Sequence, residues 1–93
     1  MENFKGTRGP WVASKSDRSI GPVSKDDDQS YGMILPVAWV EFDGKPGHHQ
    51  ANANLIAAAP ELLEALQAVV RVADRATDEF DMAHAAISKA LGQ

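Results

Sequence analysis

The stretch ANANLIAAAPELLEAL, residues 51–66, carries the strongest structural signal in this chain of 93 residues. Large apolar residues recur in it, and on to residue 70, at gaps of three and four, which is typical of an amphipathic helix with one buried face. The apolar stripe consists of Leu55, Ile56, Leu62, Leu63, Leu66, Val69 and Val70. We expect the ridge from Leu55 to Val70 to line the inside of the fold.

Pro60 interrupts this helical pattern. Proline lacks a backbone N–H and crowds the preceding turn, yet it is favoured at the first position of a helix. We therefore predict one helix from about residue 50 to residue 58, with Asn52 as its candidate N-cap. After a kink, a second segment runs from Pro60 to about Ala73.

A last helix is predicted from the spacing of its apolar residues, with Thr77 or Asp78 as the N-cap. Its buried stripe is Phe80, Ala83, Ile87, Ala90 and Leu91. No glycine or proline interrupts residues 61–91, however. One long helix therefore remains an alternative to two.

The first half of the chain predicts a small antiparallel sheet of about three strands. Residues 11–14 and 20–24 read as short strands, the second weakened because Pro22 cannot donate to a ladder. Residues 33–42 give the strongest strand signal because they are rich in β-branched and aromatic side chains. Pro36 marks either the entry of this strand or a bulge.

Side chains alternate along the third strand from Val37 onward. One side carries Val37, Trp39 and Glu41; the other carries Ala38, Val40 and Phe42. Because the second set is uniformly apolar, we expect it to pack on the helices.

Together these elements predict one α+β domain over residues 1–93. It comprises a loose arm over residues 1–9, a β-sheet region over residues 10–43 and a C-terminal helical pair over residues 50–91, on which the sheet packs.

Composition narrows the functional classes. The chain has no cysteine, which removes disulfides and thiolate metal sites, and it carries a net charge of −4. This charge argues against direct nucleic-acid binding, which favours a basic face. The N-terminus lacks an apolar leader, and no run approaches a membrane-spanning length. We expect a cytoplasmic protein without membrane association.

Candidate chemistry is sparse. No nucleophile accompanies a patterned histidine, and no glycine-rich phosphate loop is present. His48, His49 and His84 are weak candidates for a zinc site near Asp43, but adjacent histidines rarely share one ion because their side chains diverge. The aspartates of residues 26–28 lack calcium-loop spacing and predict a solvated turn over residues 25–30. We therefore expect no metal, no cofactor and no enzymatic activity.

Aromatic residues are the best candidates for a partner surface, because tryptophan and tyrosine are enriched where binding energy concentrates. With the charged residues beside them, the candidate partner-binding residues are Arg8, Trp11, Tyr31, Trp39 and Glu41.

Two segments resemble the signature of small proteins encoded by bacteriophages and prophages. Residues 7–11, TRGPW, resemble a Thr-Pro-Gly-Pro-Trp opening, with Arg8 in place of proline. Residues 51–66 resemble a helix reading ANARLIAAAPELLEAL, with Asn54 where arginine is usual, and residues 85–90 match an alanine-rich close. The resemblance implies a phage accessory protein in the host bacterial cell, and it carries no catalytic motif.

Two hypotheses for function follow. The first is a non-enzymatic binding protein that occupies a host protein or complex, for example a CRISPR effector of an antiviral defence. The second is an oligomer that sequesters a nucleotide signal; it requires Trp39 or Trp11 exposed beside Arg8, Lys15 or Arg18. A homodimer through the alanine-rich helix faces suits either, because small side chains permit close approach.

Overall fold

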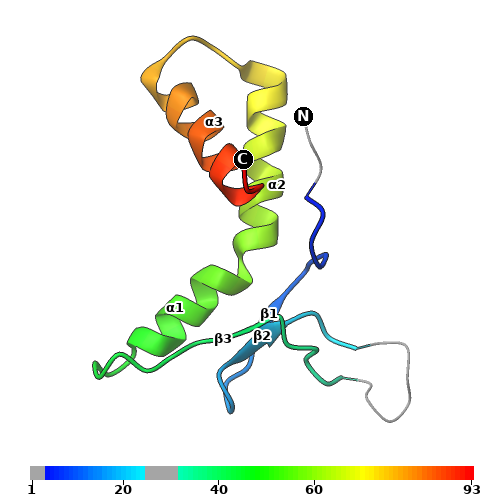
Figure 1. The fold of residues 1–93 in the computed structure, drawn as a ribbon, viewed down its shortest axis with the longest axis vertical. Coiled ribbons are helices and arrows are strands. Elements are labelled where there is room, and N and C mark those ends of the chain that lie inside the picture. The colour runs from blue at the N-terminus through cyan, green and yellow to red at the C-terminus, as the bar shows by residue number, and fades with distance from the viewer. Residues whose placement is uncertain (1–3, 25–31) are drawn as a thin grey trace. The chain divides into compact units, whose positions relative to one another are not determined.

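The computed structural model describes residues 4–24 and 32–93 and divides the chain into two compact units. The sheet unit is Thr7–Pro60, and the helical unit is Met1–Gly6 with Glu61–Gln93. The described residues confirm the predicted α+β class, with a three-stranded antiparallel sheet and three helices (Figure 1). The solvated turn predicted over residues 25–30 lies outside the described residues.

The sheet consists of β1 (Val12–Ala13), β2 (Ser19–Gly21) and β3 (Ala38–Trp39), in the order β1-β2-β3. Val12 lies opposite Gly21 and Ser19 lies opposite Trp39, so both pairings are antiparallel. The strands lie within the segments predicted for them or overlap these segments, but they are shorter.

A β-bulge interrupts the pairing of β2 with residues 33–42, which we call the third segment. Three carbonyl groups in and beside β2 accept backbone hydrogen bonds: Arg18 from Val40 at 3.0 Å, Ile20 from Val37 at 2.7 Å, and Pro22 from Leu35 at 2.8 Å. Successive acceptors are two residues apart, whereas the donors Val37 and Val40 are three apart. The third segment therefore carries one extra residue between Val37 and Val40, shortly after Pro36, which agrees with the bulge alternative.

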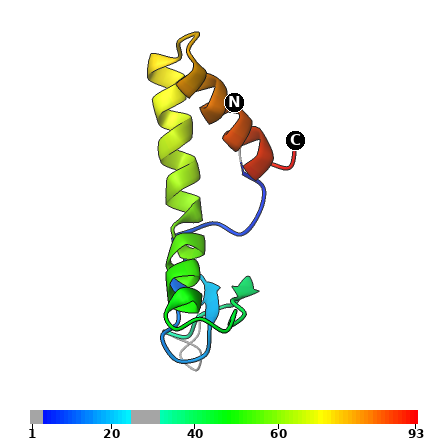
Figure 2. The same ribbon diagram turned by 90° about the vertical axis from the view of Figure 1, so that its left-hand side faces the viewer.

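The core of the sheet unit forms where the sheet meets α1 (His48–Ala57), which lies against β1 and β2 (Figures 1 and 2). The buried core residues are Ile20, Val40, Ala53 and Ala57, with Trp11 and Ala13 packed against them. Val40 thus points toward the helix, as the strand alternation predicted.

The leucine ridge lines the fold only in part, because Val70 is buried and Leu63 and Leu66 are half-buried, but the leucine of the ridge in α1 does not enter the core. Ala53 and Ala57 are the α1 residues in the core, whereas Leu55 is 65% exposed and Leu62 is also exposed. Ala53 and Ala57 are one helical turn apart, and Leu55 is rotated by roughly 200° from Ala53 because each residue turns the helix by about 100°. The small alanine side chains allow the helix backbone to lie close to the sheet.

Phe42 departs in part from its expected inward position, since its side chain is 53% exposed. Its ring does meet α1, because it packs edge-on against the His49 ring with centroids 5.6 Å apart and an interplanar angle of 70°. Phe42 therefore covers the rim of the core without entering it.

The helical pattern is interrupted at Ala58, between α1 and α2 (Ala59–Ala73), as Pro60 predicted. The Ala58 N–H still donates to the Asn54 carbonyl at 3.1 Å, but Pro60 has no N–H with which to continue the series. Asn52 is not the N-cap: α1 begins at His48, after Gly47 in the left-handed region with φ 81°.

The helical unit contains the body of α2 and α3 (Asp78–Ala90), so residues 61–91 form two helices (Figure 2). Val70 of α2 and Ile87 of α3 are buried. Thr77 caps α3, because its hydroxyl oxygen accepts a hydrogen bond from the Phe80 N–H at 3.4 Å. The two-helix alternative is confirmed together with its cap.

Replacing Thr77 with alanine is expected to destabilise α3 by about 0.5–1 kcal/mol, because the Phe80 N–H loses its acceptor. The low end of the range for lost caps applies, since the hydrogen bond is long at 3.4 Å. Amide hydrogen exchange of the first turn of α3 would measure the change, and Thr77→Ser is the matched control. Equal protection in Thr77→Ala and Thr77→Ser would show that the hydroxyl does not cap the helix.

Candidate functional site

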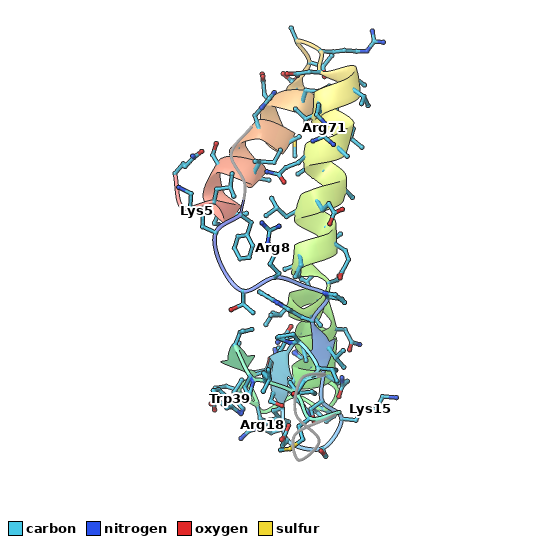
Figure 3. All side chains as sticks on the ribbon, turned by 90° about the vertical axis from the view of Figure 1, so that its right-hand side faces the viewer. Lys5, Arg8, Lys15, Arg18, Trp39 and Arg71 are labelled. Atoms are coloured by element: carbon cyan, nitrogen blue, oxygen red, sulfur yellow. The ribbon has the colours of Figure 1, made fainter. Side chains whose placement is uncertain are left out.

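The face of the sheet opposite α1 carries Trp39, the most exposed aromatic side chain among the described residues of the sheet unit. Side chains on one face of an antiparallel pair lie directly opposite each other, so Val12, Ser19, Gly21 and Trp39 define the outer sheet face. Ser19 and Gly21 are buried, and Val12 and Trp39 are its exposed members. Trp39 is 63% exposed and Figure 3 shows it projecting from the sheet unit. A tryptophan outside the core presents a large rigid surface to any molecule that approaches.

A shallow apolar hollow lies beside Val12. It is formed by Gly9, Pro10, Val12, Pro22 and Val23 and has a volume of about 530 Å³. Exposed large apolar side chains continue along the third segment at Met33, Leu35 and Val37. Exposed apolar surface of this kind makes the region a candidate contact surface.

The structure places the predicted partner-binding residues in different surroundings. Trp39 and Glu41 are exposed, and the Glu41 carboxylate lies 3.9 Å from the Arg18 guanidinium. Arg8 is exposed. Tyr31 lies outside the described residues.

Trp11 is half-buried and packs against the core. Its indole Nε1–H donates to the Thr7 carbonyl at 3.2 Å, so residues 7–11 form a closed turn. The indole therefore anchors this turn to the sheet unit.

Sequence reasoning missed Val12, Pro22 and Val23 as surface residues. The outward position of Val12 follows from side-chain alternation, because the neighbouring residues Trp11 and Ala13 both pack inward. In an extended chain the residue between two inward side chains points outward. The positions of Pro22 and Val23 depend on the bulge, which pairs Val23 with Ile34.

Each of the three histidines contacts a different neighbouring side chain. The His48 Nδ1 shares a hydrogen bond with the Asp43 carboxylate at 2.8 Å, and the His49 ring contacts Phe42. In the helical unit, the His84 Nε2 shares a hydrogen bond with the Asp74 carboxylate at 2.9 Å. Over residues 4–24 and 32–93, no three histidine or carboxylate side chains gather as a metal site would require.

The turn between β1 and β2 is held by a network of hydroxyl and carboxylate groups. The Asp17 carboxylate accepts from the Ser19 hydroxyl at 2.7 Å and from the Ser19 N–H at 3.1 Å. These bonds, with a further one from Ser14, hold the pKa of Asp17 below its usual value of 3.8. The carboxylate form therefore stabilises this turn.

This pKa shift predicts the sign of a pH effect. A carboxyl whose pKa is lowered by folding contributes stability above its unfolded pKa, and the contribution is lost as the pH falls below 3.8. Asp17→Asn is expected to remove this part of the acid sensitivity, because its amide oxygen accepts the same bonds without titrating. Urea midpoints at about pH 6 and about pH 3 would measure it, with Glu41→Gln as the exposed control. A wild type and an Asp17→Asn variant that lose the same stability would contradict the prediction.

The fold and the outer sheet face define a small α+β protein that presents an exposed aromatic surface. The family model described as Salmonella phage P22 protein Y8K6 matches residues 1–93, so the chain belongs to this phage protein family. No curated protein and no solved structure matches the chain.

The family match confirms the phage origin that the sequence resemblance implied, and it makes this a phage-encoded accessory protein. It does not test the two sequence motifs that carried the resemblance. Within the described part of the chain, no helix is both long and apolar enough to cross a membrane.

Proposed function

We propose that this phage protein is a non-enzymatic binding protein that occupies a host protein or complex in the host cytoplasm. The observation that supports the proposal best is Trp39, which is 63% exposed on the outer sheet face. Tryptophan is the residue type most enriched among those that dominate binding energy. A small domain that leaves it outside the core has this side chain available for a partner.

The surroundings of Trp39 suit a protein partner. The exposed apolar residues Val12 and Val37 extend the surface, and the charged pair Arg18 and Glu41 lies at its border. An apolar centre bordered by charged residues is the usual anatomy of a protein–protein interface. An antiviral defence complex such as a CRISPR effector is our first choice of host target, because blocking it benefits a phage directly.

Quantitative affinity purification would test the proposal. Tagged wild type, Trp39→Ala and Val72→Ala would each be expressed in the host bacterium. Val72, in the helical unit, is the matched control because it is 81% exposed. We expect one host protein to be enriched with wild type and Val72→Ala, and recovered about tenfold less with Trp39→Ala. Equal recovery with all three proteins, after circular dichroism has shown that they are folded, would refute the assignment of this surface.

A plasmid-interference assay would test the choice of target. In cells with an active CRISPR system, wild type is expected to protect a targeted plasmid and Trp39→Ala is not. If wild type binds a host protein through Trp39 but leaves interference intact, the target is a different host component.

One observation favours a second function, the sequestration of a nucleotide signal. Trp39 is exposed, and Arg18 lies nearby, because the Val40 N–H donates to the Arg18 carbonyl at 3.0 Å; Figure 3 shows both side chains in the sheet unit. An aromatic face beside a cation can stack a base and hold a phosphate. Calorimetry with cyclic nucleotides, with light scattering for the oligomeric state, would test this function; absence of heat would eliminate it.

A homodimer is a further part of the proposal. Ala53 and Ala57, the alanines of α1 that would permit close helix approach, are in the core of the sheet unit. A dimer would therefore use another alanine-rich face or the outer sheet face, and light scattering of Trp39→Ala separates these cases.

A further inference from the structure

A small pocket lies on the α1 side of the sheet unit, where the β1–β2 turn meets the first turns of α1. It is lined by Ser14, Lys15, Ser16 and Arg18 of the turn and by His49 and Gln50 of α1, and its volume is about 60 Å³. One water requires roughly 10–15 Å³ on the same measure. The pocket therefore has room for one small polyatomic group and is too small for a nucleobase with its sugar.

The walls of the pocket are preformed. The Ser14 N–H donates to the Ser19 carbonyl at 2.8 Å, which closes the turn. The Ser14 hydroxyl oxygen accepts from the backbone N–H groups of Ser16 at 3.1 Å and Asp17 at 3.2 Å. Because these bonds fix the turn, a ligand would bind with little ordering of the chain.

The charge of the pocket opposes that of the chain as a whole. Two basic residues, Lys15 and Arg18, line it and no carboxylate does, although the chain carries a net charge of −4. Three acidic residues of the sheet unit have partners beside the pocket, and one of them, Asp43, shares a hydrogen bond with His48 at 2.8 Å. Asp17 accepts from Ser19, and Glu41 is 3.9 Å from Arg18 in an exposed pair, which contributes little.

Two features of α1 add to this preference for negative charge. Its first turn contains no acidic residue, and Gly47 provides no side-chain cap. The positive end of the helix dipole lies next to His49 and Gln50, and the carboxylate at this end is that of Asp43, which shares a hydrogen bond with His48 at 2.8 Å. His49 also has a buried ring nitrogen, Nδ1, without a hydrogen-bond partner. A buried polar atom of this kind normally has one.

We propose that this pocket is a binding site for a single phosphate group, either free or at the end of a monoester. Lys15 and Arg18 neutralise its charge, and the Ser16 hydroxyl and Gln50 amide donate hydrogen bonds to its oxygens. The pocket shares Arg18 with the border of the outer sheet face, but Trp39 does not line it, so phosphate binding does not depend on the partner proposed for Trp39.

Backbone amide NMR of the full chain, titrated with inorganic phosphate in low salt, would test the site. We expect saturable shifts at the amides of Ser16, Arg18, His49 and Gln50. Chloride at equal ionic strength is expected to leave these amides unchanged. Adenosine monophosphate and glycerol phosphate would then separate the two sources. Shifts at the same four amides with either ester would show that the site accepts a monoester, and shifts with inorganic phosphate alone would show that it takes the free ion.

Phosphate binding by single variants would test whether the pocket itself holds the phosphate. Arg18→Gln and Lys15→Gln are each expected to weaken phosphate binding about tenfold, and Gln50→Ala less. Arg75→Gln is the matched control, because Arg75 is an exposed basic residue of the helical unit. Spectra without phosphate would show that each variant is folded. The proposal is overturned if phosphate produces no saturable shifts, if the shifts spread over all basic surfaces, or if Arg18→Gln binds as tightly as Arg75→Gln.

Discussion

Replacing Gly21 with alanine is expected to destabilise the sheet unit by roughly 3 kcal/mol or more, the severe end of the range for overpacking. A Cβ at this position would clash with the Leu35 carbonyl oxygen and would lie 2.9 Å from the Leu35 carbonyl carbon and 3.1 Å from the Val37 nitrogen. All three are backbone atoms, which cannot turn away as the end of a side chain can. The third segment crosses over β2 at this point.

The bulge after Pro36 explains why the clash is severe. The Leu35 N–H donates to the carbonyl of Pro22, next to β2, at 2.8 Å, and the Val37 N–H donates to that of Ile20 at 2.7 Å, so moving Leu35 away from Gly21 would break the pairing on both sides. Urea unfolding followed by circular dichroism would measure the loss, and failure of Gly21→Ala to fold is within the expected result.

Gly44→Asn is the control for Gly21→Ala. Gly44 has φ 87°, with nothing within 4 Å of an added Cβ, and asparagine tolerates this conformation. We expect this variant to be close to wild type. A Gly21→Ala protein as stable as Gly44→Asn would show that the crossing of Leu35 over β2 is incorrect.

Replacing Ile20 with alanine is expected to cost about 2–5 kcal/mol. Ile20 is 0% exposed and is the largest fully buried side chain among the described residues. It lies in the core with Val40, Ala53 and Ala57, and the two alanines have no longer side chains with which to fill a cavity. The stability of a chain this size is on the order of 5–14 kcal/mol, so a large part of it would be lost.

Two comparisons make the Ile20 result interpretable. Ile20→Val removes one methylene and is expected to cost about 0.5–1.5 kcal/mol. Val12→Ala, on β1 in the same sheet, is expected to cost less than about 1 kcal/mol because its side chain is 43% exposed. If Ile20→Ala were no more destabilising than Val12→Ala, the core would not be organised around Ile20.

Much of the secondary structure could be predicted because its causes are local. The interruption near Pro60 follows from one missing N–H, and the Thr77 cap follows from a hydroxyl three residues before an unpaired N–H. The alternation that turned Val40 inward and Trp39 outward is a property of any extended chain. These predictions required no knowledge of what each element packs against.

The inner face of the helix could not be predicted in the same way. The spacing of large apolar residues favoured Leu55 and its successors, whereas Ala53 and Ala57 are the residues in the core. Hydrophobicity ranks side chains by the area they can bury, and it does not say how closely two segments approach. Where a helix backbone lies close to a sheet, small residues are required.

The residues of the candidate sites also differ in whether the sequence or only the tertiary structure could place them. Trp39 could be placed on the outer face from the sequence, but Trp11 equally qualified as a partner residue until its indole was found on the Thr7 carbonyl and against the core. The phosphate pocket brings Arg18 to His49, which are far apart along the chain. No spacing rule connects such residues.

The sequence by itself determined that the helical pattern breaks near Pro60, that Thr77 or Asp78 can begin a last helix, and that Val40 and Trp39 face opposite ways. These features depend on φ preferences, hydrogen-bond donors and side-chain periodicity within a few residues. Only the tertiary structure decided that alanines rather than leucines meet the sheet, that Leu35 crosses Gly21, and that the β1–β2 turn encloses a basic pocket with α1. These features depend on the distance between segments remote in sequence, which is set by how whole elements pack.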